Sequence, residues 1–142
     1  MSYLRAYGIF LALALITAMH QLPPVESLVL VAGKVRISNQ FPSPLVLHCN
    51  SDHYKIDLGN QTVRGGSFFE WNISVVVGKS NVYSCVMYSR NKVGDFVLFD
   101  PEKDVSSEVC GFKNFFCDWQ LRNGGLFLFY TKRREYVLRY PF

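Results

Sequence analysis

The densest group of side chains that could do chemistry is His48, Cys49, Asp52 and His53. Imidazole, thiolate and carboxylate groups bind zinc, and two histidines can also serve as the acid and base of a secreted ribonuclease. In an extended chain, however, His48 and Cys49 point to opposite faces, so at most one of them can enter a shared site. A disulfide-bonded Cys49 could not bind metal either. We therefore predict a structural role for this group.

Motifs of other enzyme classes are missing from the chain. No Gly-x-Ser-x-Gly sequence is present, and the glycine pairs at 65–66 and 124–125 have hairpin spacing with no phosphate-binding pattern. The two histidines outside the N-terminal segment lie within one short stretch, which disfavours a ribonuclease. The sequence predicts a protein with no catalytic residues, no bound metal and no cofactor.

The N-terminal segment has the pattern of an export signal. Arg5 precedes an apolar run over residues 8–18, which is about half of the ~20 residues that a membrane-spanning helix needs, and Pro23 and Pro24 follow. Cleavage after Ser27 fits the small-residue rule, with Ala18 and Ala32 as competing positions. We expect residues 1–27 to be a signal peptide and residues 28–142 to be one secreted domain without a transmembrane segment.

All four cysteines lie in the expected mature chain. In an exported domain they predict two disulfides, and four cysteines allow three pairings. We favour Cys110 with Cys117 as a local clamp and Cys49 with Cys85 as a link between two strands.

The charge of the chain is mildly basic, at +4. This net charge favours binding to acidic polymers, acidic proteins or anionic headgroups. The basic residues lack the clustering expected of a nucleic-acid-binding protein. The sharpest basic run is Lys132, Arg133 and Arg134. We interpret it as a solvated hairpin turn, with contact to acidic wall polysaccharide or lipid headgroups as the alternative.

Apolar and polar residues alternate along most of the chain, as in half-buried strands. The first apolar row is Val35, Ile37 and Phe41, and turn residues such as Asn123-Gly124 separate the rows. Later rows include Leu45, Leu47 and Cys49; Tyr54, Ile56 and Leu58; Phe69, Trp71, Ile73 and Val75; Phe115, Cys117, Trp119 and Leu121; and Tyr136, Leu138 and Tyr140. The pattern predicts an all-β fold, a small antiparallel β-sandwich of eight or nine short strands stapled by disulfides.

Two Asn-x-Ser/Thr sequons are consistent with export. Asn60 is expected in a turn after Gly59, and Asn72 falls on the polar side of its strand, opposite Trp71. Both are predicted glycosylation sites that leave the core undisturbed.

Several motifs in fixed order resemble a known family. They are LHCNS at 47–51, DLG at 57–59, FEWNI at 69–73, CVM at 85–87, FVLF at 96–99 and CDW at 117–119. From about residue 35 to residue 140, the chain resembles the plant self-incompatibility S-protein homologues, most closely the stigma S proteins of poppies. It departs from them before Leu58-Gly59, where only the two ends of the usual acidic run remain.

This resemblance implies a small secreted β-sandwich with intrachain disulfides and no catalytic activity. It further implies a stigma signal that inhibits pollen of matching specificity through a receptor in the pollen plasma membrane. The receptor-binding candidates are charged residues in exposed connections: Asp100, Glu102, Lys103, Asp104, Asp52 and His53. We expect replacements within residues 100–108 to weaken activity without affecting folding.

A carbohydrate- or wall-binding module is the main alternative function. Such a module would present aromatic rings on a solvent-exposed face, and the candidates are Phe68, Tyr88 and Phe127. Trp71 and Trp119 fall on buried parities and are expected in the core.

Overall fold

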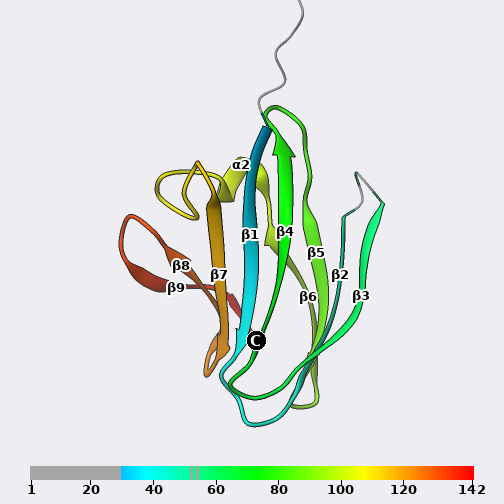
Figure 1. Cartoon of the computed structure of the whole chain (residues 1–142). Helices are drawn as coiled ribbons and strands as arrows, with labels where there is room; N and C mark the ends of the chain where they lie inside the picture. The colour runs from blue at the N-terminus through cyan, green and yellow to red at the C-terminus, as the bar shows by residue number, and fades with distance from the viewer. Residues whose placement is uncertain (1–29, 52, 54) are drawn as a thin grey trace, which may run out of the picture.

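The computed structural model describes residues 30–51, 53 and 55–142, which form a two-layered β-sandwich (Figure 1). One sheet has five strands in the order β4-β1-β7-β8-β9, and the other has four in the order β3-β2-β5-β6. The strands are β1 (Leu30–Asn39), β2 (Leu45–Ser51), β3 (Ile56–Val63), β4 (Phe68–Val76), β5 (Tyr83–Ser89), β6 (Lys92–Phe99), β7 (Phe115–Arg122), β8 (Gly125–Tyr130) and β9 (Glu135–Pro141). The sandwich prediction is confirmed.

One strand pair departs from the expected antiparallel arrangement. β1 runs parallel to β7, with Val35 opposite Cys117 and Ile37 opposite Trp119, whereas the other pairs are antiparallel. A parallel pair needs a long crossover between its strands, and here the crossover includes the whole four-stranded sheet. The alternation of apolar residues contains no information about strand direction, so it did not predict this pair.

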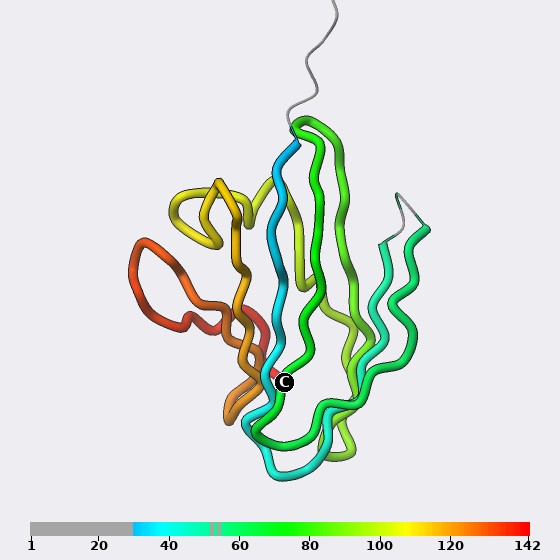
Figure 2. Tube along the Cα trace, in the orientation of Figure 1, coloured from blue at the N-terminus to red at the C-terminus, as the bar shows by residue number. Residues whose placement is uncertain are grey.

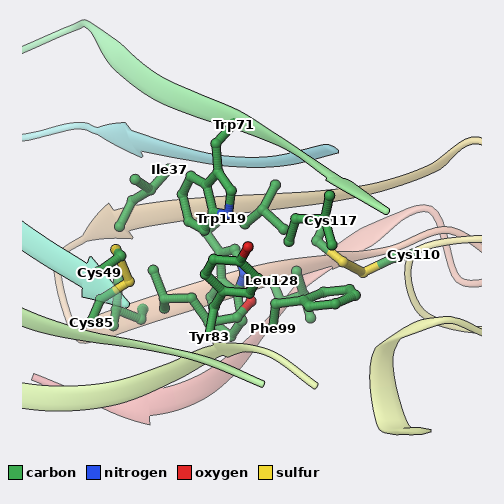
Figure 3. Packing of buried hydrophobic residues seen from close by; sticks show 14 of the residues in the cluster. Ile37, Cys49, Trp71, Tyr83, Cys85, Phe99, Cys110, Cys117, Trp119 and Leu128 are labelled. Carbon is green, nitrogen blue, oxygen red and sulfur yellow. Dashed lines mark hydrogen bonds between the residues drawn. A yellow bond between two sulfur atoms is a disulfide. The ribbon is translucent and has the colours of Figure 1, made fainter. Parts of the chain in front are cut away.

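Aromatic side chains and both disulfides fill the space between the sheets (Figure 3). Trp119 is fully buried, and its Nε1 donates a hydrogen bond to the carbonyl oxygen of Leu98 at 2.8 Å. This bond links the five-stranded sheet to the four-stranded one. Trp71 is also buried, as expected for both tryptophans.

The disulfides pair as the sequence favoured. Cys49 is bonded to Cys85, directly opposite it on β5, and Cys110 is bonded to Cys117. In Figure 3 the two disulfides lie on either side of the aromatic cluster. One therefore joins neighbouring strands of one sheet, and the other fastens the segment between β6 and β7 to the start of β7.

The expected apolar rows fail at the sheet edges. Ile56 on edge strand β3 is 40% exposed, and Leu138 on edge strand β9 is 44% exposed after a register shift between β8 and β9. Tyr54 lies outside the described residues. Gly59 has φ +69° and lies next to a register shift between β2 and β3, but the strand continues past it. Asn60 therefore lies inside β3 and not in the expected turn. An edge strand has a partner on one side only, which weakens the link between parity and burial.

The described residues include no helix long and apolar enough to cross a membrane.

Candidate recognition surface

The segment between β6 and β7, residues 100–114, contains a short helix that the sequence did not predict. This helix, α2 (Pro101–Asp104), lies near the end of the sandwich where β1 begins (Figures 1 and 2). Asp100 caps it, because its carboxylate accepts a hydrogen bond from the Glu102 backbone nitrogen at 3.1 Å. Pro101 suits the first helical turn because it has no N–H to satisfy. The signal for this helix, Asp-Pro followed by acidic residues, was present in the sequence.

Asp104 faces inward and is only 2% exposed. Its Oδ2 accepts a hydrogen bond from the Asp100 backbone nitrogen at 2.8 Å, and its Oδ1 lies 3.6 Å from Arg139 Nη1 on β9. Burial is the main effect on this carboxyl and raises its pKa, although Arg139 acts in the opposite direction. The expectation that Asp104 is exposed is therefore wrong. We now expect its replacement to destabilise the fold.

The other three candidates in this segment differ in exposure. The Asp100 side chain is 16% exposed and is engaged in capping the helix. Glu102 and Lys103 are exposed, and Lys103 Nζ lies 3.3 Å from Asp100 Oδ2. Only Glu102 and Lys103 thus have the exposure that was expected of all four residues.

The candidate His53 lies between β2 and β3, two strands of the four-stranded sheet. His53 is exposed in the turn that joins these strands. Asp52 lies outside the described residues. The recognition role of both residues remains a prediction.

The basic turn, residues 131–134 between β8 and β9, contacts the segment between β6 and β7. Lys132, Arg133 and Arg134 are all exposed. Lys132 Nζ lies 2.8 Å from Glu108 Oε1 and lowers the pKa of that carboxyl. These two charged segments are separate in the sequence, whereas the structure places them side by side.

The two sequons lie on opposite outer faces of the sandwich. Asn60 is exposed on β3 of the four-stranded sheet, and Asn72 is exposed on β4 of the five-stranded sheet. His48 lies beside Asn60, with Nδ1 2.9 Å from Asn60 Oδ1 and Nε2 2.6 Å from Asp57 Oδ1. The pKa of Asp57 is lowered chiefly by the Gly59 backbone N–H. His48 is thus held by two neighbours on β3, and no group of three potential metal ligands occurs in the described part of the chain.

Arginine side chains stack on several aromatic rings at the surface of the five-stranded sheet. The Arg36 guanidinium lies 4.4 Å from the ring centre of Phe68 and 4.9 Å from that of Phe116, and Arg122 lies 4.0 Å from Phe127. These stacked arginines were not predicted from the sequence, although alternation places Arg36 and Arg122 on the solvent side. Tyr88, the remaining aromatic candidate, lies on the other sheet. The three rings therefore do not form one open stacking platform.

Taken together, the geometry defines a disulfide-stapled β-sandwich whose exposed connections carry charged side chains. Residues 34–142 match the family model described as plant self-incompatibility protein S1, and the chain belongs to this family. No curated protein matches the chain. Membership suggests a role in pollen rejection, and members are typically ligands without enzymatic activity.

Proposed function

We propose that this protein is a secreted ligand of the pistil or stigma that is recognised by a receptor in the pollen plasma membrane and inhibits self pollen. Family membership over residues 34–142 is the observation that carries this proposal. The two disulfides fit an oxidising, extracellular location.

Recognition is assigned to the end of the sandwich that carries α2. Glycans on Asn60 and Asn72 would cover parts of the two outer faces, whereas Glu102 and Lys103 project from a capped helix in a segment held by the Cys110–Cys117 disulfide. A rigid support lowers the entropy lost when exposed side chains bind a partner.

The test is pollen-tube inhibition by the purified protein with Glu102→Ala or Lys103→Ala. Both variants should unfold at the wild-type temperature and inhibit incompatible pollen several-fold less. Asp95→Ala and Lys92→Ala are matched controls, because these exposed residues of β6 carry the same charges away from α2. Full activity of both α2 variants would move the site to the Asp52–His53 turn or to the basic turn.

Processing of the leader and the use of the sequons belong to the same proposal. N-terminal sequencing of the secreted protein should begin at Leu28. Asn60→Gln combined with Asn72→Gln should shift the mass by the lost glycans while secretion and pollen inhibition remain. Loss of inhibition by this folded double variant would place a glycan or its sheet face in the recognition surface.

A second candidate function is binding of acidic wall polysaccharide. The exposure of Lys132, Arg133 and Arg134 in a single turn favours it. Affinity electrophoresis in gels containing polygalacturonate should retard the wild type, and the triple alanine variant should migrate as in a gel without the polymer. Equal retardation of both proteins would exclude the basic turn as the binding site.

A further inference from the structure

An apolar pocket opens at the same end of the sandwich as α2. Its wall includes Val31 and Val75 at neighbouring positions on β1 and β4, together with Pro101 and Val105 from the segment between β6 and β7. Val31, Val75 and Pro101 are buried, and Val105 is half-buried. The pocket is therefore built on two paired strands and on a segment fastened by a disulfide, so its shape is supported from both sides.

The size of the pocket limits what can occupy it. Its volume is about 220 Å³. Cavities of ~150 Å³ accommodate a benzene ring, whereas pockets for drug-sized ligands have ~300–1,000 Å³. The volume thus suits one aromatic ring or one branched aliphatic side chain.

The mouth of the pocket has an apolar margin and two opposite charges. Val77 is 54% exposed and Phe112 is 52% exposed, and both side chains line this opening. Lys79 and Glu102 line the same pocket from the turn after β4 and from α2. An apolar centre with charged groups at its edge is the arrangement typical of protein-protein contact sites.

We propose that this pocket receives one bulky apolar side chain, aromatic or branched aliphatic, from a protein partner. Lys79 and Glu102 would pair with opposite charges flanking that anchor residue. A single side chain that fills a desolvated pocket is the usual form of a binding hot spot. This inference rests on the proposed function, since the partner it describes is the pollen receptor.

The first test addresses the pocket without any receptor. Methyl NMR spectra of the secreted protein are recorded with N-acetylphenylalaninamide, N-acetylleucinamide and N-acetylglycinamide as probes. The first two probes should shift the methyl signals of Val31, Val75 and Val105 in a saturable manner, and the glycine probe should not. Absence of such shifts, or shifts of equal size at Val93 on β6, would overturn the proposal.

The second test uses binding to pollen plasma-membrane vesicles. Val77→Asp should weaken binding by about tenfold, because it places a charge where an apolar side chain would be buried. Val93→Asp is the matched control, since Val93 is 63% exposed on β6, and it should bind within about twofold of the wild type. Both variants should keep the wild-type unfolding temperature.

The outcomes separate the two proposals. Wild-type binding that Val77→Asp leaves unchanged would overturn the pocket while the receptor function stands. Failure of the wild type to bind vesicles would overturn the receptor function, and the NMR titration alone would then decide whether the pocket accepts apolar side chains.

Discussion

The segment between β6 and β7 and the basic turn between β8 and β9 look alike in sequence but differ in structure. Both are charged connections. In the first, Asp104 is buried and Asp100 caps a helix, so part of its charge supports the fold. In the second, Lys132, Arg133 and Arg134 are all exposed. A run of charged residues therefore does not by itself identify a surface on which side chains can be exchanged freely.

The two segments also differ in how they are held. The first is closed by the Cys110–Cys117 disulfide and by hydrogen bonds from the backbone nitrogens of Cys110 and Ser106 to the Asp104 carbonyl oxygen. The basic turn is held to the first segment by Thr131 and Lys132. This difference predicts that stability effects will be large in the first segment and small in the second.

The largest effect is expected from removal of the clamp. Cys110→Ser combined with Cys117→Ser should lower the free energy of unfolding by roughly 2.5 kcal/mol, because the unfolded chain regains the entropy of a short closed loop. Urea unfolding followed by tryptophan fluorescence measures this loss of unfolding free energy. Alanine at Lys132, Arg133 and Arg134 is the contrasting variant and should leave the unfolding midpoint nearly unchanged. Equal losses of unfolding free energy in the cysteine variant and the triple alanine variant would contradict the proposed difference between the two segments.

Next in size is the loss of the Asp104 carboxylate. Asp104→Ala should destabilise the protein by about 2 kcal/mol, because it leaves the Asp100 N–H without its acceptor in a partly buried site. Asp104→Asn should recover most of this loss, since its side-chain oxygen can accept the same bond. Glu102→Ala, two residues away and exposed, is the control and should be neutral. Thermal unfolding of the three variants tests this order.

The same carboxyl should give a pH dependence of known sign. Because burial raises the folded-state pKa of Asp104, the folded state holds this proton more tightly than the unfolded state does. Its stabilising contribution is full below the ordinary Asp pKa of about 3.9 and is lost as the pH rises through the raised value. The stability of wild type relative to Asp104→Asn should therefore fall with rising pH in that window. A relative stability that increases with pH would contradict the assignment.

Much of the fold could be predicted from the sequence because the interior is regular. On β7, the expected row of Phe115, Cys117, Trp119 and Leu121 is buried throughout. Central strands have partners on both sides and core on one face, so alternation directly reports burial. The favoured disulfide between Cys49 and Cys85 is also confirmed, and the two residues lie opposite each other on β2 and β5. Alternation placed both cysteines on buried rows but left three pairings open.

The candidate site could be predicted only in part, because side-chain direction in a connection depends on local capping and on distant contacts. Asp104 is buried and lies near Arg139, which is far along the chain on β9. No pattern within residues 100–108 predicts the proximity of Asp104 to Arg139. The apolar pocket likewise forms only where β1, β4 and the segment after β6 come together, so no single stretch of sequence predicts it.

A smaller effect is expected where the two segments meet. Thr131 Oγ1 donates a hydrogen bond to the Val109 carbonyl oxygen at 2.7 Å, and the Thr131 backbone nitrogen donates to the same oxygen. Thr131→Val keeps the shape and the backbone bond, so the cost should be roughly 1 kcal/mol or less. Thr131→Ser, which retains the hydroxyl, serves as the control. A loss above that of Asp104→Ala would mean that the turn, and not the disulfide, chiefly holds the first segment.

The smallest stability effect is expected at the ion pair between the two segments. The Lys132 and Glu108 side chains are 67% and 64% exposed, and exposed pairs contribute little to folding. Neither Lys132→Gln nor Glu108→Gln should move the unfolding temperature measurably.

Lys132→Gln and Glu108→Gln should nevertheless have opposite effects on polygalacturonate binding. Glu108→Gln removes the anion beside Lys132 and should strengthen binding, whereas Lys132→Gln should weaken it. Added salt should shrink the difference between the two variants, because exposed charges are screened within about 10 Å at 0.1 M ionic strength. If both variants bind the polymer like the wild type at low salt, the basic turn acts only as a solvated connection. The segment between β6 and β7 and the basic turn would then differ only in how deeply their charged side chains are buried.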